Sequence, residues 1–156
     1  MDEGSDPYSL AQTLALIALA PRAKSRGELF AHLKKRGIAE EIAHAVLYRL
    51  QEEGLVNDEE FARSWSESRQ RTKKLSKRAI VNELRAKGID ADVIEIVGSE
   101  IDENREHDLA LELASRKYRP IAHLERDLIQ RRIQGALARR GFSAGLINTV
   151  MREMGI

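Results

Sequence analysis

Basic side chains gathered in short runs are the residues of this chain whose type and spacing could do chemistry. The 156 residues carry a net charge of only +1, but the charge is unevenly spread. Residues 69–78 hold six basic residues and no acidic one, whereas residues 90–112 hold nine acidic residues and one arginine. Such blocks suit contact with the phosphates of a nucleic acid and with a charged protein surface, and they also occur on plainly solvated helix faces.

The run at residues 73–78 is the strongest candidate for phosphate contact. It is expected to lie between two helices and to open the second, where cations oppose the helix dipole; the alternative is a solvated linker. Other basic residues stand before Gly37, Gly88 and Gly141, where a helix C-terminus favours cations without any ligand. The candidate residues for contact with DNA or a partner protein are Lys34, Lys35, Arg36, Lys73, Lys74, Lys77, Arg78, Arg85, Lys87, Arg131, Arg132, Arg139 and Arg140.

Residue patterns for other kinds of chemistry do not occur in the sequence. The chain has no cysteine, which excludes a disulfide, a thiolate zinc site and a cysteine nucleophile. Its four histidines form no HExxH motif, and the sequence contains neither a glycine-rich phosphate loop nor a GxSxG element. We therefore expect no enzyme activity, no metal site and no cofactor.

A repeated signature divides the chain: a leucine, a glycine four residues later, and then a large apolar residue. It occurs at residues 33–38, 84–89 and 137–142, so the three glycines lie 51 and 53 residues apart. Each glycine fits the C′ position, where a left-handed residue ends a helix at low cost. A repeat of this length predicts a tandem array of small modules, each supported by its neighbours.

Each module is predicted to contain three helices, because apolar residues recur at helical spacing and no long stretch alternates as a half-buried strand would. The modules are expected at residues 8–54, 55–103 and 104–156, after a disordered segment at residues 1–7. The third module has a few extra residues near 119–123. The predicted fold class is all-α, with three tandem three-helix repeats forming an elongated, curved array.

Apolar residues that stand four positions apart in each helix are predicted to face the core. Residues 10–20 are apolar but too short to span a bilayer, so we interpret them as a buried first helix. Trp65 is expected to pack in the core rather than stack on a base. The predicted core pairs of the first helices are Leu10 and Leu14, Phe61 and Trp65, and Leu109 and Leu113; those of the second helices are Leu29 and Leu33, Ile80 and Leu84, and Ile133 and Leu137.

Helix starts are marked by residues that can cap an N-terminus. Ser25 with Glu28 predicts a capping box, and Ser76 stands at the equivalent position of the next module. Asn57 or Asp58 can cap the first helix of the second module. These signals agree with the helix periods and place a helix start after each predicted turn.

Several stretches of the sequence resemble one protein family. The run Gly-Leu-Val-Asn-Asp-Glu-Glu-Phe-Ala at residues 54–62, followed by Arg69, resembles the signature of the bacterial RecX regulatory proteins. Similar stretches lie at residues 75–89 and 137–147, and the resemblance extends over residues 8–154. No single motif is specific, but their order and spacing together are.

The resemblance implies three tandem three-helix repeats and a cytoplasmic modulator of the RecA recombinase. Such proteins lie in the groove of the RecA–DNA filament and typically inhibit its ATPase, strand-exchange and coprotease activities, and some bind DNA directly. We therefore expect as partners the RecA filament and single-stranded DNA, with double-stranded DNA as a further candidate, both through backbone contacts, and a monomer without membrane contact. Two alternatives stay open: a helix-turn-helix-like DNA-binding module, and a helical scaffold that binds only protein.

Overall fold

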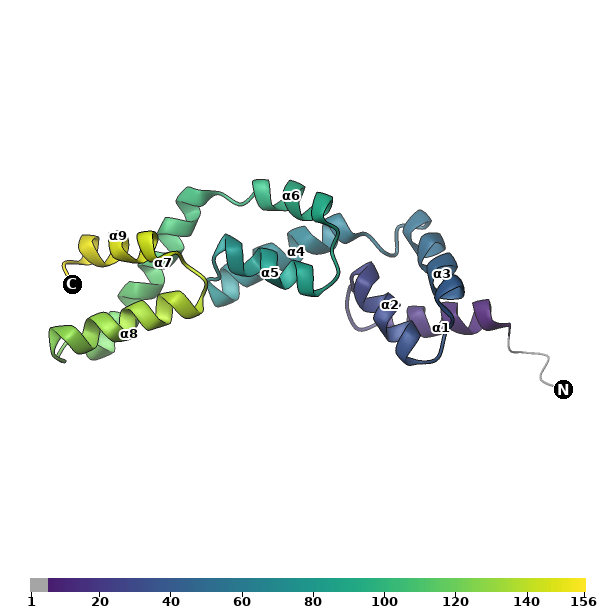
Figure 1. Cartoon of the computed structure of the whole chain (residues 1–156), viewed down its shortest axis with the longest axis horizontal. Coiled ribbons are helices and arrows are strands. Elements are labelled where there is room, and N and C mark those ends of the chain that lie inside the picture. The colour runs from purple at the N-terminus through teal and green to yellow at the C-terminus, as the bar shows by residue number, and fades with distance from the viewer. Residues whose placement is uncertain (1–5) are drawn as a thin grey trace. The chain divides into compact units, whose positions relative to one another are not determined.

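Every regular element in the described part of the chain is a helix. The computed structural model describes residues 6–156, except the side chain of Glu103, and no strand occurs among these residues (Figure 1). The predicted all-α class is therefore confirmed. The helices are α1 (Pro7–Leu19), α2 (Arg26–Lys35), α3 (Glu40–Glu52), α4 (Asp58–Lys73), α5 (Lys77–Ala86), α6 (Ala91–Ser99), α7 (Glu103–Tyr118), the 3₁₀-helix η1 (Arg119–Ile121), α8 (Arg126–Arg139) and α9 (Ala144–Met154).

Contacts within the chain define two compact units. The first consists of Met1–Arg63 and Leu84–Ile94, and the second of Ser64–Glu83 and Glu95–Ile156. The division therefore passes through α4, α5 and α6. One part of these three helices belongs to the unit of α1, α2 and α3, and the other part belongs to the unit of α7, α8 and α9. The bounds of the three predicted modules stay a prediction.

The predicted N-terminal disorder lies mostly outside the described residues, because the description begins at Asp6. The carboxylate of Asp6 accepts a hydrogen bond from the backbone N–H of Tyr8, and Pro7 is the first residue of α1. Asp6 thus caps α1 and Pro7 is already helical, although both residues belong to the segment predicted to be disordered. The extra residues predicted near 119–123 coincide with η1, which includes Pro120.

Each terminal set of helices surrounds its own apolar core. In the first unit α1, α2 and α3 pack on one another, and in the second α7, α8 and α9 do the same (Figure 1). The core pairs predicted for the second helices are confirmed. Completely buried are Leu29, Leu33, Ile80, Leu84, Ile133 and Leu137.

The first helix of each predicted module buries small residues, and in α1 they take the place of the large residues expected in the core. Leu10 is 48% exposed and Ile17 is 65% exposed, so the prediction of a buried first helix was wrong for these positions. Small side chains on the contact line let the helix axes approach closely, and the large residues then flank the contact. The buried small residues are Ala11 and Ala15 in α1, Ala62 and Ser66 in α4, and Ala110 and Ala114 in α7.

The repeated leucine–glycine signature forms a Schellman motif at the end of α2, α5 and α8. In each motif the backbone N–H of the residue after glycine donates to the leucine carbonyl, at 3.0, 3.1 and 3.3 Å. The three glycines have φ values of 86°, 76° and 90°, which confirms the predicted left-handed position. The leucine and the residue after the glycine are buried in every copy, so the motif joins the helix end to the core.

Side chains cap the helices largely as predicted. Ser25 and Glu28 form the capping box of α2, and the Ser76 hydroxyl accepts a hydrogen bond from the Ala79 N–H at 3.1 Å. Asn57 rather than Asp58 caps α4, because its side chain accepts from the Glu60 N–H at 3.1 Å. The carboxylate of Asp58 instead accepts from the Arg26 N–H at 2.8 Å, at the start of α2. Burial raises the pKa of Asp58 despite this hydrogen bond.

His107 links α7 to α9 within the second unit. Its Nε2 lies 2.9 Å from Oε2 of Glu153, and its Nδ1 lies 3.5 Å from Oδ1 of Asp108. The hydrogen bond with Glu153 raises the pKa of His107 above its ordinary value of 6.5. Because the folded-state pKa is the higher one, the charged pair stabilises the unit below pH 6.5 and this contribution is lost as the pH rises through the folded-state pKa.

We expect Glu153→Gln to lower the pKa of His107 and to weaken this pH dependence. The imidazole pKa is measured by following the His107 ring protons by NMR, and stability by urea unfolding at several pH values. A His107 pKa that does not change in Glu153→Gln would contradict the ion pair.

Candidate functional site

The segment between α4 and α5 docks on the glycine turn that ends α8. The Ser76 N–H donates to the Arg140 carbonyl at 2.9 Å, and the Arg140 guanidinium donates to the Lys73 carbonyl at 2.5 Å. A Cβ on Gly141 would lie 2.4 Å from Oγ of Ser76 and 2.7 Å from Cβ of Ala79. Glycine at this position therefore allows the contact, which brings Arg140 beside Lys73 although 67 residues separate them.

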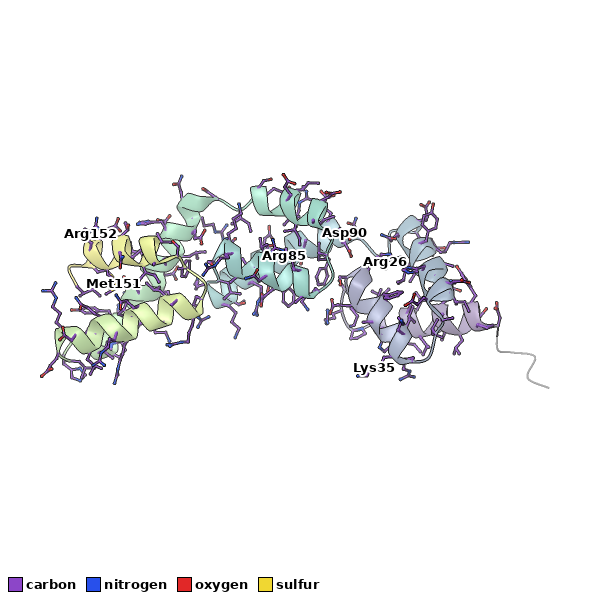
Figure 2. The ribbon with its side chains drawn as sticks, viewed as in Figure 1. Arg26, Lys35, Arg85, Asp90, Met151 and Arg152 are labelled. Carbon is purple, nitrogen blue, oxygen red and sulfur yellow. The ribbon has the colours of Figure 1, made fainter. Side chains whose placement is uncertain are left out.

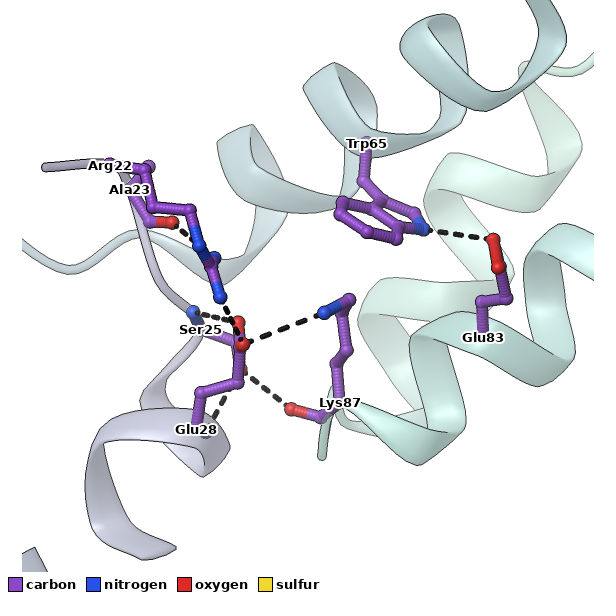
Figure 3. Close-up of polar contacts among 7 residues, drawn as sticks. All are labelled: Arg22, Ala23, Ser25, Glu28, Trp65, Glu83 and Lys87. Carbon is purple, nitrogen blue, oxygen red and sulfur yellow. Dashed lines mark hydrogen bonds and ion pairs between the residues drawn. The ribbon is translucent and has the colours of Figure 1, made fainter. Parts of the chain in front are cut away.

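An equivalent contact occurs in the first unit. The Ser25 hydroxyl donates to the Lys87 carbonyl at 2.6 Å, and a Cβ on Gly27 would lie 2.8 Å from the same oxygen (Figure 3). The Lys87 ammonium lies 3.5 Å from the Glu28 carboxylate and 6.0 Å from the centre of the Phe61 ring. Lys87 is thus held within the fold by an acidic and an aromatic partner.

Both contacts involve residues that the repeat makes equivalent. Ser25 and Ser76 differ by 51 positions, and Lys87 and Arg140 by 53, which are the spacings of the glycines. Sequence reasoning placed these serines as helix caps but missed that each also binds the glycine turn of the next module. The shared spacing was the signal that could have revealed it.

The basic run at residues 73–78 divides into exposed and paired cations. Lys73 is the exposed last residue of α4, where the helix dipole favours it, so the expectation that the whole run lies between helices was wrong there. Lys74 has a φ of 53° and its ammonium lies 3.5 Å from the Glu112 carboxylate. Lys77 and Arg78 occupy the first turn of α5, where cations oppose the dipole as predicted.

We define the basic junction as Lys73, Lys77, Arg78 and Arg140. Lys77 and Arg78 line a recess of about 410 Å³ together with Glu106, Gly141 and Ser143. Lys73 and Arg78 are exposed, whereas Lys77 and Arg140 are partly buried. The docking of Ser76 on Arg140 therefore gathers cations from α4, α5 and the end of α8 in the second unit.

Arg69, at the start of the basic segment, is bound within the fold. Its guanidinium donates to both oxygens of Glu83, each at 2.7 Å, and lies 5.3 Å from the centre of the Trp65 ring. The hydrogen bonds with Glu83 raise the pKa of Arg69. The Trp65 Nε1–H also donates to Glu83 at 3.2 Å, and the indole is partly buried (Figure 3). The expected core position of Trp65 is thus only partly buried.

A groove of about 470 Å³ crosses the end of α7, η1 and α8 in the second unit. The apolar part of its lining, which we call its floor, includes Pro120, Ile121, Leu128 and Ile133. We call it the basic groove because its other lining includes the four exposed cations Lys117, Arg131, Arg132 and Arg139.

The four cations of the basic groove form no ion pair among the described side chains, none of whose carboxylates lies within 4.0 Å of them. Elsewhere in the second unit, Arg69, Lys74 and Arg116 each have a carboxylate partner. Gly135 leaves space for Arg139, whose guanidinium nitrogen lies 3.1 Å from where a Cβ on Gly135 would stand. The groove therefore presents concentrated positive charge beside apolar surface.

The remaining predicted cations lie at the ends of α2 and α5. Lys35 and Arg36 are exposed, and Lys34 binds the Glu40 carboxylate at 2.5 Å. Arg85 is exposed in the last turn of α5; Figure 2 labels it together with Lys35 at the end of α2. These positions complement the helix dipole, as the sequence suggested.

Residues 6–156, the described part of the chain, contain neither a metal-binding cluster nor a helix able to span a membrane. No group of three or more histidine, cysteine, aspartate or glutamate side chains in this region could hold a metal ion. None of the helices described there combines the length and apolarity needed to cross a bilayer.

Comparisons with known proteins match the chain to one family. The models for the first, second and third three-helix domains of RecX match residues 11–50, 57–97 and 104–151. Regulatory protein RecX of Streptomyces coelicolor is 40% identical over 148 residues, covering 95% of this chain and 79% of that protein. The corresponding protein of Mycobacterium avium is 42% identical over 137 residues, covering 87% and 79%.

A solved structure has the same fold. The crystal structure of RecX from Lactobacillus salivarius has a TM-score of 0.83 and 24% sequence identity, covering 96% of this chain and 97% of that one. Together with the three domain matches, this confirms the predicted fold class of three tandem three-helix repeats.

Proposed function

This chain belongs to the RecX family of regulatory proteins, and we propose that it binds the RecA recombinase filament on DNA and inhibits it. The activities lowered would be the filament ATPase, strand exchange and coprotease function. The observation that carries this proposal is the match of all three RecX domains, in order, along nearly the whole chain. The relatives are named regulatory proteins, which favours a binding role over catalysis.

We assign the main DNA backbone contacts to the basic junction. Lys77 and Arg78 stand at a helix N-terminus, where positive charge is unfavourable unless an anion is near. Arg140 adds a guanidinium beside Lys73, and a phosphate could offset the repulsion among these cations. Contacts of this kind carry no sequence information, which suits a protein acting on DNA of any sequence.

The other predicted contact residues fall into three groups. Lys34, Lys74 and Lys87 already have acidic partners in the fold, so they contribute mainly to the overall electric field. Arg131, Arg132 and Arg139 line the basic groove. Lys35, Arg36 and Arg85 are exposed and remain candidates for secondary contacts with DNA or protein.

The proposal is tested by the ATPase activity of RecA from the same organism on single-stranded DNA. We expect the rate to fall when this protein is added to preformed filaments at well below one molecule per RecA. Unchanged ATPase, strand exchange and repressor cleavage at saturating protein would refute the modulator function.

The same preparation distinguishes the two alternatives. A stand-alone DNA-binding module would bind DNA without RecA, and its affinity would fall steeply with salt. A protein-only scaffold would not bind DNA and would use the acidic residues within 90–112. The exposed cations of the basic junction favour DNA contact over the scaffold.

A further inference from the structure

We propose that the basic groove binds an acidic peptide segment of a partner protein, one that also carries at least one large apolar side chain. The groove lies wholly within the second unit, between the end of α7, η1 and α8. The inference does not rest on the proposed function, because it concerns a surface that no DNA contact or RecA contact is needed to explain.

The charge of the groove favours an acidic ligand. Lys117, Arg131, Arg132 and Arg139 surround one groove without an acidic partner among the described side chains. Clustered like charges repel one another, and carboxylates placed among them would form charge-assisted hydrogen bonds. Arginine is suited to this task, since its planar guanidinium can bind both oxygens of a carboxylate.

The apolar floor of the groove favours a peptide over a nucleic acid. Phosphate contacts would leave the partly exposed floor residues Ile121 and Leu128 unused. Bases stack on flat aromatic or guanidinium faces, but the floor residues are aliphatic or proline. A leucine or phenylalanine side chain would bury its surface there, while neighbouring glutamates reach the cations at the rim.

The dimensions of the groove agree with such a segment. A volume of about 470 Å³ is within the range of pockets that enclose small ligands, and it accommodates a few side chains. Arg132 and Arg139 are seven residues apart on α8, which corresponds to about 10 Å along the helix axis. Acidic residues three apart in an extended peptide, or two turns apart in a helical one, span a similar distance.

Fluorescence anisotropy with labelled twelve-residue peptides tests the proposal on the full chain. One peptide combines four glutamates with two leucines, a second replaces the leucines with serines, and a third replaces the glutamates with glutamines. We expect the first to bind at least tenfold more tightly than either control. If the first two peptides bind with equal affinity, binding depends on charge alone and the proposal is wrong. The proposal is also wrong if the first peptide does not bind.

Variants then locate the binding. The double variant Arg131→Glu with Arg139→Glu should lower the affinity for the acidic, leucine-containing peptide at least tenfold. Leu128→Gln should also lower this affinity but leave weak charge-driven binding. The control variant Arg105→Glu with Arg126→Glu has the same change in net charge at two exposed positions outside the groove. An equal loss in the control would place the peptide elsewhere.

Competition with a twelve-nucleotide oligothymidine decides between the two ligand classes. The affinities of the oligonucleotide and of the peptide are compared in the variant Arg131→Glu with Arg139→Glu. If the oligonucleotide binds the parent chain and loses more affinity in this variant than the peptide does, the groove is a nucleic-acid site and the proposal is wrong. If the oligonucleotide leaves the peptide bound, the groove is a peptide site. Neither result depends on RecA, so the ATPase experiment can fail or succeed separately.

Discussion

Replacing Gly141 with alanine is expected to destabilise the second unit by about 2 to 4 kcal/mol, the largest effect of any single substitution considered for this chain. Part of the cost is the left-handed backbone, since Gly141 has a φ of 90°. The larger part is overlap with Ser76 and Ala79, which lie 2.4 and 2.7 Å from the position of the new Cβ. Relief of this overlap requires the segment between α4 and α5 to move away from the end of α8.

Gly37→Ala is the matched control. Gly37 has a φ of 86° and ends α2 in the same motif, but no neighbouring atom lies within 4 Å of the position of its Cβ. Only the backbone strain remains, so we expect a loss of about 1 kcal/mol. The difference between the two variants measures what the packed contact adds to the helix-ending role of glycine.

Urea unfolding provides the measurement. Trp65 is the only tryptophan and lies in the second unit, so its fluorescence follows the unit that contains Gly141. Far-UV circular dichroism follows the helices of both units and is used for Gly37→Ala. Equal losses of stability in the two variants would show that Gly141 acts only through its backbone and would contradict the docked turn.

Reversing two charges of the basic junction, Lys73→Glu with Arg78→Glu, is expected to weaken binding to single-stranded DNA or to the RecA filament by about tenfold or more. Both side chains are exposed, so the substitutions leave the cores intact. The logarithm of the binding constant should also depend less on the logarithm of salt concentration, with the slope smaller by about two. Lys74 is left unchanged because a glutamate there would face Glu112.

Binding is measured by anisotropy of a labelled oligonucleotide, with and without RecA, at several salt concentrations. Arg105→Glu with Arg126→Glu again matches the change in net charge, and glutamate is favourable at both positions because they lie in the first turns of α7 and α8. We expect this control to bind almost as well as the parent chain. If both double variants lose affinity equally, the junction is not a specific phosphate site and only overall charge matters.

Features that depend on neighbouring residues in the chain could be predicted from the sequence. The Schellman motif at Gly37, Gly88 and Gly141 and the capping box of Ser25 are set by backbone conformation and hydrogen bonds within a few residues. Apolar spacing within each second helix likewise identified its core face, since all six predicted residues are buried. The repeat itself indicated the three-module fold.

Features that depend on close packing between helices were predicted less well. Leu10 was expected in the core, but α1 packs through Ala11 and Ala15 and leaves Leu10 half exposed. Helical spacing identifies an apolar face, and α1 is apolar on too many sides for spacing to select one. Which face is buried depends on the shape of the neighbouring helices.

By itself, the sequence determined the helical repeat, the glycine turns and the presence of many cations, because each follows from local chemistry. Only the tertiary structure decided which cations are paired and which stand exposed. Lys87 and Arg69 find carboxylates on other helices, whereas Arg131 and Arg139 line a groove without one. The physical reason is that an ion pair requires two side chains to meet in space. Packing of α4 on α5 brings Arg69 to Glu83. The hydrogen bond of Ser25 to the Lys87 carbonyl holds Lys87 near Glu28.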